Sequence, residues 1–159
     1  MARMTDDMQR VVDEQRLAFV ATVNADGTPN LSPKGTIGVL DDEHLVFADL
    51  ASPNTIANLR RNPSTEMNVV DPVTRKGYRF TGRAEVFGDG ERFRELVAFF
   101  AEGPRAVSRP DERIRHVVVV AVDRCQPLVS PAYDIGASER DVSQRWETYF
   151  TELWTRRRG

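Results

Sequence analysis

The sequence NLSPKGTIGVLDDEHLVFADLASPNTIANLRRNP, residues 30–63, decides the fold because it joins two predicted strands to a predicted helix. Residues 29–39 form the first of these strands, and the acidic residues 41–43 make the turn that follows it. The apolar residues 44–49 form the next strand, and antiparallel pairing would place it beside the first. We therefore expect a hairpin that leads into a helix.

The predicted helix begins at Ser52 and Pro53, because serine is a preferred N-cap residue and proline fits the first helical position. Asn62 and Pro63 end the helix, since a residue before proline disfavours the helical conformation. Amides in the first turn of a helix lack partners and attract anions, and Lys34, one strand away, adds a positive charge. The stretch thus predicts a phosphate-bearing ligand; the alternative is that Lys34 is a solvated lysine at a strand end.

The rest of the chain alternates between helical and extended patterns. Residues 4–15 have the apolar spacing of an amphipathic helix, and residues 139–156 predict a helical tail. The valine-rich run 117–122 predicts a buried strand that continues after a bend near Asp123. Further strands are expected over residues 17–23, 65–70 and 77–87.

Six or seven strands follow one another in hairpins, and the first three form a predicted meander. This order favours an antiparallel β-barrel over a sandwich, because closure removes edge strands. The fold class is therefore mainly β with flanking helices. A length of 159 residues with 40% hydrophobic content fits one domain spanning residues 1–159.

Composition narrows the classes of partner and chemistry. Lys and Arg number 22 against 24 Asp and Glu, a net charge of -2, so nothing favours nucleic acid. No apolar run approaches the roughly 20 residues that span a bilayer, and the N-terminus lacks an apolar signal core. We expect a cytoplasmic protein with no membrane partner.

Conventional catalytic and metal-binding groups are sparse. The single cysteine, Cys125, excludes an intrachain disulfide and a multi-cysteine metal site. The histidines, His44 and His116, have no carboxylate or cysteine at metal-ligand spacing, so neither a metal site nor a hydrolytic triad is expected. Any chemistry would therefore come from a cofactor.

Several segments together resemble a known family. They are GTP at residues 27–29, SPKG at 32–35, LVF at 45–47, SPNTIANLRRNP at 52–63 and GRAEV at 82–86. Their order and spacing resemble the pyridoxamine 5'-phosphate oxidase-like proteins, the FMN-binding split-barrel family. The resemblance covers roughly residues 10 to 130, and its most specific part is the combination of strand, helix and Asn-Pro ending.

The resemblance implies an antiparallel split β-barrel that forms a homodimer, with FMN sites at the interface built by both subunits. It also implies cofactor-binding residues, and no catalytic residue is assigned. Along the cofactor would lie Ser32, Lys34, Gly35 and Thr36; near the flavin ring Ala48 and Asp49; and at the phosphate end Asn54, Thr55 and Asn58.

The chain departs from the true oxidases at two places. Those enzymes carry an arginine and a lysine early in the helix, where this chain has Asn54 and Thr55. They also end with arginine and histidine residues that grip the substrate phosphate, a pattern absent from residues 146–154. Oxidation of pyridoxamine phosphate is therefore not the expected activity.

The leading hypothesis is an FMN-dependent oxidoreductase that acts on an unidentified small substrate. A close alternative replaces FMN with a deazaflavin, as in the deazaflavin-dependent reductases of the same family. A second alternative is a flavin or haem carrier without turnover, and a third is a fold that has lost its ligand. The sequence leaves open which of these applies.

Overall fold

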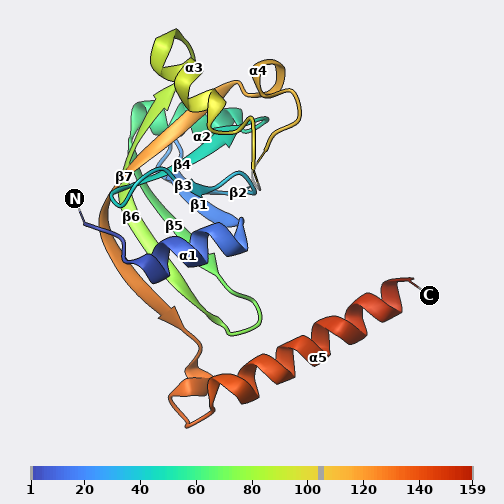
Figure 1. The fold of residues 1–159 in the computed structure, drawn as a ribbon. Helices are drawn as coiled ribbons and strands as arrows, with labels where there is room; N and C mark the ends of the chain where they lie inside the picture. The colour runs from blue at the N-terminus through green and yellow to red at the C-terminus, as the bar shows by residue number, and fades with distance from the viewer. Residues whose placement is uncertain (1, 104–105, 159) are drawn as a thin grey trace.

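One curled antiparallel sheet of seven strands forms the body of the molecule in the computed structural model, which describes residues 2–103 and 106–158 (Figure 1). The sheet makes a half-barrel with flanking helices, so the predicted mainly β antiparallel fold is confirmed. Residues 1, 104, 105 and 159 of the predicted 1–159 domain lie outside the described residues. The elements are α1 (Asp6–Gln15), β1 (Ala18–Val23), β2 (Pro29–Lys34), β3 (Gly38–Val39), β4 (His44–Asp49), α2 (Pro53–Arg61), β5 (Ser64–Val70), β6 (Lys76–Phe87), α3 (Gly90–Ala98), α4 (Pro110–Arg113), β7 (His116–Val129), a 3-10 turn (Pro131–Tyr133) and α5 (Glu139–Arg158).

The strand order is β2-β1-β5-β6-β7-β4-β3, and the predicted meander of the first three strands is wrong. The predicted strand over residues 29–39 breaks after Lys34, so that β2 pairs with β1 while β3 pairs with β4 at the other edge. The body of β4 then pairs with β7 rather than β2. The reason is burial. β4 is buried on both faces, and its position beside β7 places an apolar cluster against each face of the strand.

The long strands β6 and β7 form the centre of the sheet. Their register shifts between Thr81 and Gly82, because Thr81 faces Arg124 while Gly82 faces Val122. Asp123 is therefore the extra residue of a β-bulge, which confirms the bend predicted there. A Cβ on Gly82 would lie 2.2 Å from a backbone oxygen of β7, so this position requires glycine.

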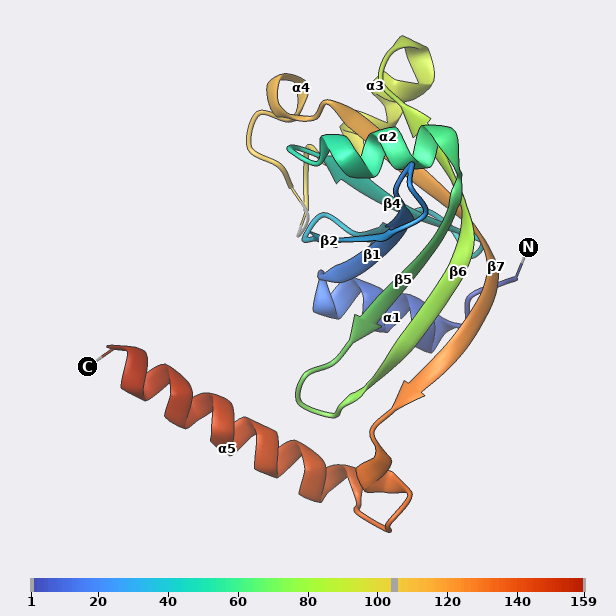
Figure 2. The same cartoon turned by 180° about the vertical axis from the view of Figure 1, so that it is seen from behind.

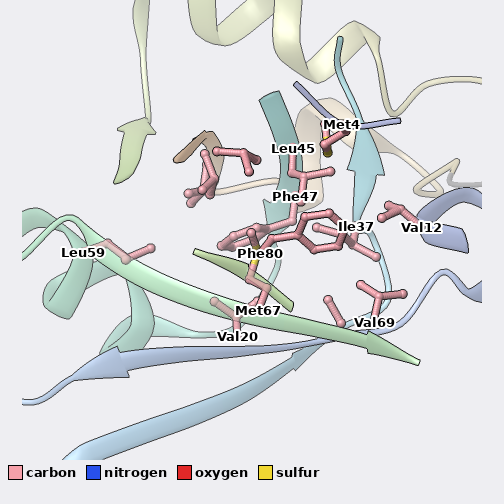
Figure 3. Close-up of a cluster of buried hydrophobic side chains, with 14 of the residues drawn as sticks. Met4, Val12, Val20, Ile37, Leu45, Phe47, Leu59, Met67, Val69 and Phe80 are labelled. Atoms are coloured by element: carbon pink, nitrogen blue, oxygen red, sulfur yellow. The ribbon is translucent and has the colours of Figure 1, made fainter. Parts of the chain in front are cut away.

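The larger of two apolar clusters fills the inside of the curled sheet (Figure 3). Phe47 of β4 and Phe80 of β6 are fully buried there beside Met67 of β5. Val12 of α1 and Leu59 of α2 join the same cluster from the two helices. Figure 2 shows α2 lying across one end of the sheet, and the helices thereby close the half-barrel.

A smaller cluster lies where α3 covers β4 and β7. Leu96, Val97 and Phe100 pack there against Val46 and Val117. Among the helices of the described residues, none is long and apolar enough to cross a membrane. The cytoplasmic location stays a prediction.

Candidate functional site

A cleft of about 360 Å³ opens where the end of β2 meets the end of β4. One wall is the segment 32–36 at and after the end of β2, and the other runs from Ala48 to the start of α2. The two walls are joined by Thr36, whose hydroxyl donates to the Ala48 carbonyl and accepts from the Ala48 amide, both at 3.0 Å. The cleft thus brings together five of the predicted site residues: Ser32, Lys34, Gly35, Thr36 and Ala48.

Lys34 is the main charged group of this cleft. Its side chain is only 6% exposed, and its Nζ donates a 2.6 Å hydrogen bond to Ser32 Oγ. Burial lowers the pKa of Lys34, and the attraction of the nearby Asp49 carboxylate opposes that shift only in part. No carboxylate of the described residues forms an ion pair with Nζ, so the ammonium has hydrogen-bonding capacity left for an anion.

Asp49 lies at the end of β4 with its carboxylate almost fully buried, at 2% exposure. Oδ1 accepts from the Ser52 amide at 2.8 Å and the Ser52 hydroxyl at 2.6 Å, while Oδ2 lies 3.0 Å from His116 Nδ1. Burial alone would raise the pKa of Asp49, but the hydrogen bonds from Ser52 and His116 outweigh it and lower the pKa. Asp49 therefore stays ionised, and its bonds to Ser52 fix the turn that leads into α2.

The hydrogen bonds of Asp49 correct the predicted capping role of Ser52 and add His116 to the site. Ser52 does occupy the N-cap position of α2, yet its hydroxyl binds Asp49 and makes no capping hydrogen bond. His116 was missed because it comes from β7, and only the pairing of Asp49 with His116 across β4 and β7 brings the two together. The other histidine, His44, pairs with Asp41 at 2.8 Å.

The three predicted phosphate-binding residues of α2 lie outside the cleft lining. Asn58 is buried, and its Nδ2 donates to Thr22 Oγ1 at 3.0 Å and to Asn24 Oδ1 at 2.8 Å. Thr55 is also buried and accepts from Asn30 Nδ2 at 3.5 Å, whereas Asn54 is exposed. A ligand that used Thr55 or Asn58 would have to compete with these internal bonds.

The chemistry of the cleft suits an anionic ligand. It offers a buried ammonium, the hydroxyl of Ser32, which accepts from Lys34 and keeps its own proton to donate, and the backbone leading to the first turn of α2. The described part of the chain holds no group of three or more His, Cys, Asp or Glu residues that could bind a metal.

Comparison with known proteins identifies relatives over most of the chain. A family model described as pyridoxamine 5'-phosphate oxidase matches residues 4–128. An uncharacterized protein of Methanocaldococcus jannaschii, MJ0282, is 26% identical over 132 residues, which are 82% of this chain and 84% of that protein. The crystal structure of HupZ from Group A Streptococcus is 30% identical and superimposes with a TM-score of 0.69, over 80% of this chain and 95% of that one.

Two further solved structures share the fold at lower identity. An FMN-binding protein from Syntrophomonas wolfei has a TM-score of 0.63 at 13% identity, covering 77% of this chain and 84% of its own. An F420 reductase has a TM-score of 0.59 at 22% identity, covering 77% of this chain and 98% of its own. These two similarities extend to the fold alone.

Proposed function

The chain belongs to the pyridoxamine 5'-phosphate oxidase family, and from that membership and the cleft beside Lys34 we propose that it binds FMN and acts as an oxidoreductase on a small substrate. The observation that carries the proposal is the buried ammonium of Lys34. A buried charge without a direct ion-pair partner is costly, and a phosphate or another anionic group of the cofactor would supply that partner. The FMN-binding structural neighbour from Syntrophomonas wolfei is consistent with this choice.

The residues of the cleft have distinct roles in this proposal. Lys34 binds the anionic part of the ligand, and Ser32 holds the ammonium in place through its 2.6 Å hydrogen bond. Thr36 and Ala48 keep the two walls together. Asp49 positions the turn before α2 through Ser52. When bound, FMN would supply the redox centre that the protein's side chains lack.

We also propose that a second copy of the chain completes the site. The outward face of β1 and β2 exposes large apolar side chains, with Leu31 at 65% and Phe19 at 46% exposure. Such a face is typical of a surface that another protein covers. A homodimer with the cofactor sites at its interface agrees with these observations.

The deazaflavin alternative is supported by the F420 reductase among the structural neighbours. The two cofactors can be separated by analysis of the purified protein: its visible absorption spectrum is recorded, and whatever heat releases is identified by mass spectrometry. Released FMN supports the proposal, whereas a released deazaflavin replaces FMN with that cofactor.

Turnover is tested on the same preparation. A colourless protein is first titrated with FMN and with a deazaflavin, and failure to bind either overturns the redox function. If a cofactor binds, its reduction by a nicotinamide donor and its reoxidation are followed by absorbance. Consumption of the donor supports an enzyme, and a bound cofactor that is never reduced supports a carrier.

A further inference from the structure

The C-terminal helix α5 is fastened to the rest of the chain only near its first turns, among the described interactions. Lys76 Nζ binds Glu139 at 2.6 Å, and the Arg75 guanidinium stacks on the Trp146 ring at 3.4 Å from its centroid. Val142, between these two residues of α5, is buried. Figures 1 and 2 show that the remainder of the helix points away from the sheet. The base of α5 is therefore fixed while its far half projects as an arm, residues 147–158.

The arm continues an apolar stripe that starts at its anchored base. Trp146, Phe150 and Leu153 follow at three- and four-residue spacing, which places them on one face of the helix. Tyr149 and Trp154 beside this stripe are 44% and 55% exposed. An amphipathic helix gains most of its stability from packing its apolar face, so the arm needs a partner surface. The family model ends at residue 128, so the arm lies beyond the matched segment.

A groove of about 410 Å³ lies beside the base of α5, between α1, the hairpin that joins β5 to β6, and the end of β7. Its apolar floor includes Val11 and Leu128, next to Val129, which is 52% exposed. Its charged rim has more carboxylates than cations. The rim consists of Asp7, Glu14, Asp71 and Glu139 against Arg10 and Lys76.

The arm has the complementary charge. Its last turn carries Arg156, Arg157 and Arg158, against two carboxylates in the rest of the arm, Glu147 and Glu152. Glu139 is the only described residue of α5 that lines the groove, so the molecule's own arm leaves the groove open. We propose that the arm of one copy docks in this groove of a second copy, with aromatic side chains on the apolar floor and arginines at the acidic rim. A twofold axis would make the exchange reciprocal. The inference does not depend on the proposed cofactor.

The scarcity of lysine allows a direct test. Lys34 and Lys76 are the only lysines of the chain, so Arg157→Lys places a new primary amine on the arm. A carbodiimide joins amines to carboxylates in direct contact. Equal amounts of unlabelled and ¹⁵N-labelled variant are mixed, treated and analysed by mass spectrometry. We expect cross-links from residue 157 of one copy to Asp7, Glu14 or Asp71 of the other.

The matched control is Arg94→Lys on α3, which also gives an exposed amine, at a position far along the chain from the arm. It should give no cross-links to the groove. Cross-links from residue 157 that stay within one chain, or that reach only other surfaces, would overturn the proposal. The proposal would also be overturned if residue 157 formed no cross-links and the protein sedimented with anionic lipid vesicles, because the arm would then be a membrane contact.

Fluorescence gives a second measurement that needs no cross-linking. Trp146→Phe leaves Trp154 as the only tryptophan and keeps an aromatic ring for Arg75. Docking should shift the Trp154 emission to shorter wavelength and reduce its quenching by acrylamide as the protein concentration rises. Emission and quenching that stay those of an exposed tryptophan at every concentration would contradict the proposal.

Discussion

Replacing Lys34 with methionine removes a buried ammonium from the cleft while it keeps a side chain of similar length and an apolar stem. If the ammonium binds the anionic part of FMN, the variant should bind FMN more weakly. A hydrogen bond to a charged group contributes about 1.5–3 kcal/mol, which corresponds to about a 10- to 150-fold loss of affinity. The deep burial of Lys34 favours the upper part of this range, because little water reaches the site.

The same change should not destabilise the protein without its ligand. Lys34 Nζ has the bond to Ser32 Oγ at 2.6 Å, but its burial carries a desolvation cost of several kcal/mol. Methionine avoids that cost, so the free energy of unfolding is expected to stay equal or to rise. A loss of affinity without a loss of stability is the signature of a ligand-binding lysine.

FMN affinity is measured by flavin fluorescence, and stability by urea unfolding without FMN. Lys76→Met is the matched control, because Lys76 is the other lysine of the chain and its exposed ammonium pairs with Glu139. The control should bind FMN as the unmodified protein does. Unchanged affinity in Lys34→Met, or a fall in stability that accounts for the weaker binding, would refute this account of the cleft.

Four further outcomes follow from the structure. FMN affinity should fall as the pH rises through the lowered pKa of Lys34, since only the ammonium form attracts an anion. The fall is measured by fluorescence titrations at several pH values, and Lys34→Met should not show it. The Asp49 pKa is lowered in the fold, so Asp49 stabilises the protein above the ordinary carboxyl pKa and this stability is lost as the pH falls through the folded value. Asp49→Asn should therefore cost about 1–3 kcal/mol in urea unfolding at neutral pH, and the difference should shrink in acid. Gly82→Ala should unfold the protein or lower its melting temperature steeply, because the new Cβ would meet a backbone oxygen at 2.2 Å, whereas Gly35→Ala, with 3.9 Å to the nearest atom, should melt normally. Asn58→Ala should lower the free energy of unfolding by about 1–3 kcal/mol, because Thr22 and Asn24 lose the hydrogen bonds that Asn58 donates. An unchanged FMN affinity in the folded variant would mark Asn58 as a structural residue rather than a ligand-binding one.

Local patterns predicted the elements of this fold better than their arrangement. The valine-rich strand, the bend near Asp123 and the helix from Pro53 were all readable from nearby residues. The place of β4 beside β7 was not, because that pairing joins distant segments. The break after Lys34 separates β2 from β3 and so frees β4 to lie at the other side of the sheet. In the sequence the only sign of this break is Gly35, and one glycine within an extended pattern is a weak signal of a strand end.

The cleft shows the same division between local and distant information. Lys34 was predicted from its place one strand away from a helix N-terminus, and the resemblance to the family added Ala48. His116 was out of reach without the register of β7. The inward orientation of Thr55 and Asn58 did have a signal in the sequence, since both share the buried stripe of α2 with Ile56 and Leu59. Polar residues within such a stripe are typical of internal hydrogen bonds.

The pairing of β4 with β7 also has a consequence during synthesis of the chain. Residues 44–49 leave the ribosome long before residues 116–121, which are their partners across the sheet. Until then Leu45, Val46 and Phe47 lack one neighbouring strand, although all three are fully buried in the finished protein. The nascent chain must therefore carry an uncovered apolar strand while the intervening residues are translated, and an exposed strand of this kind favours aggregation.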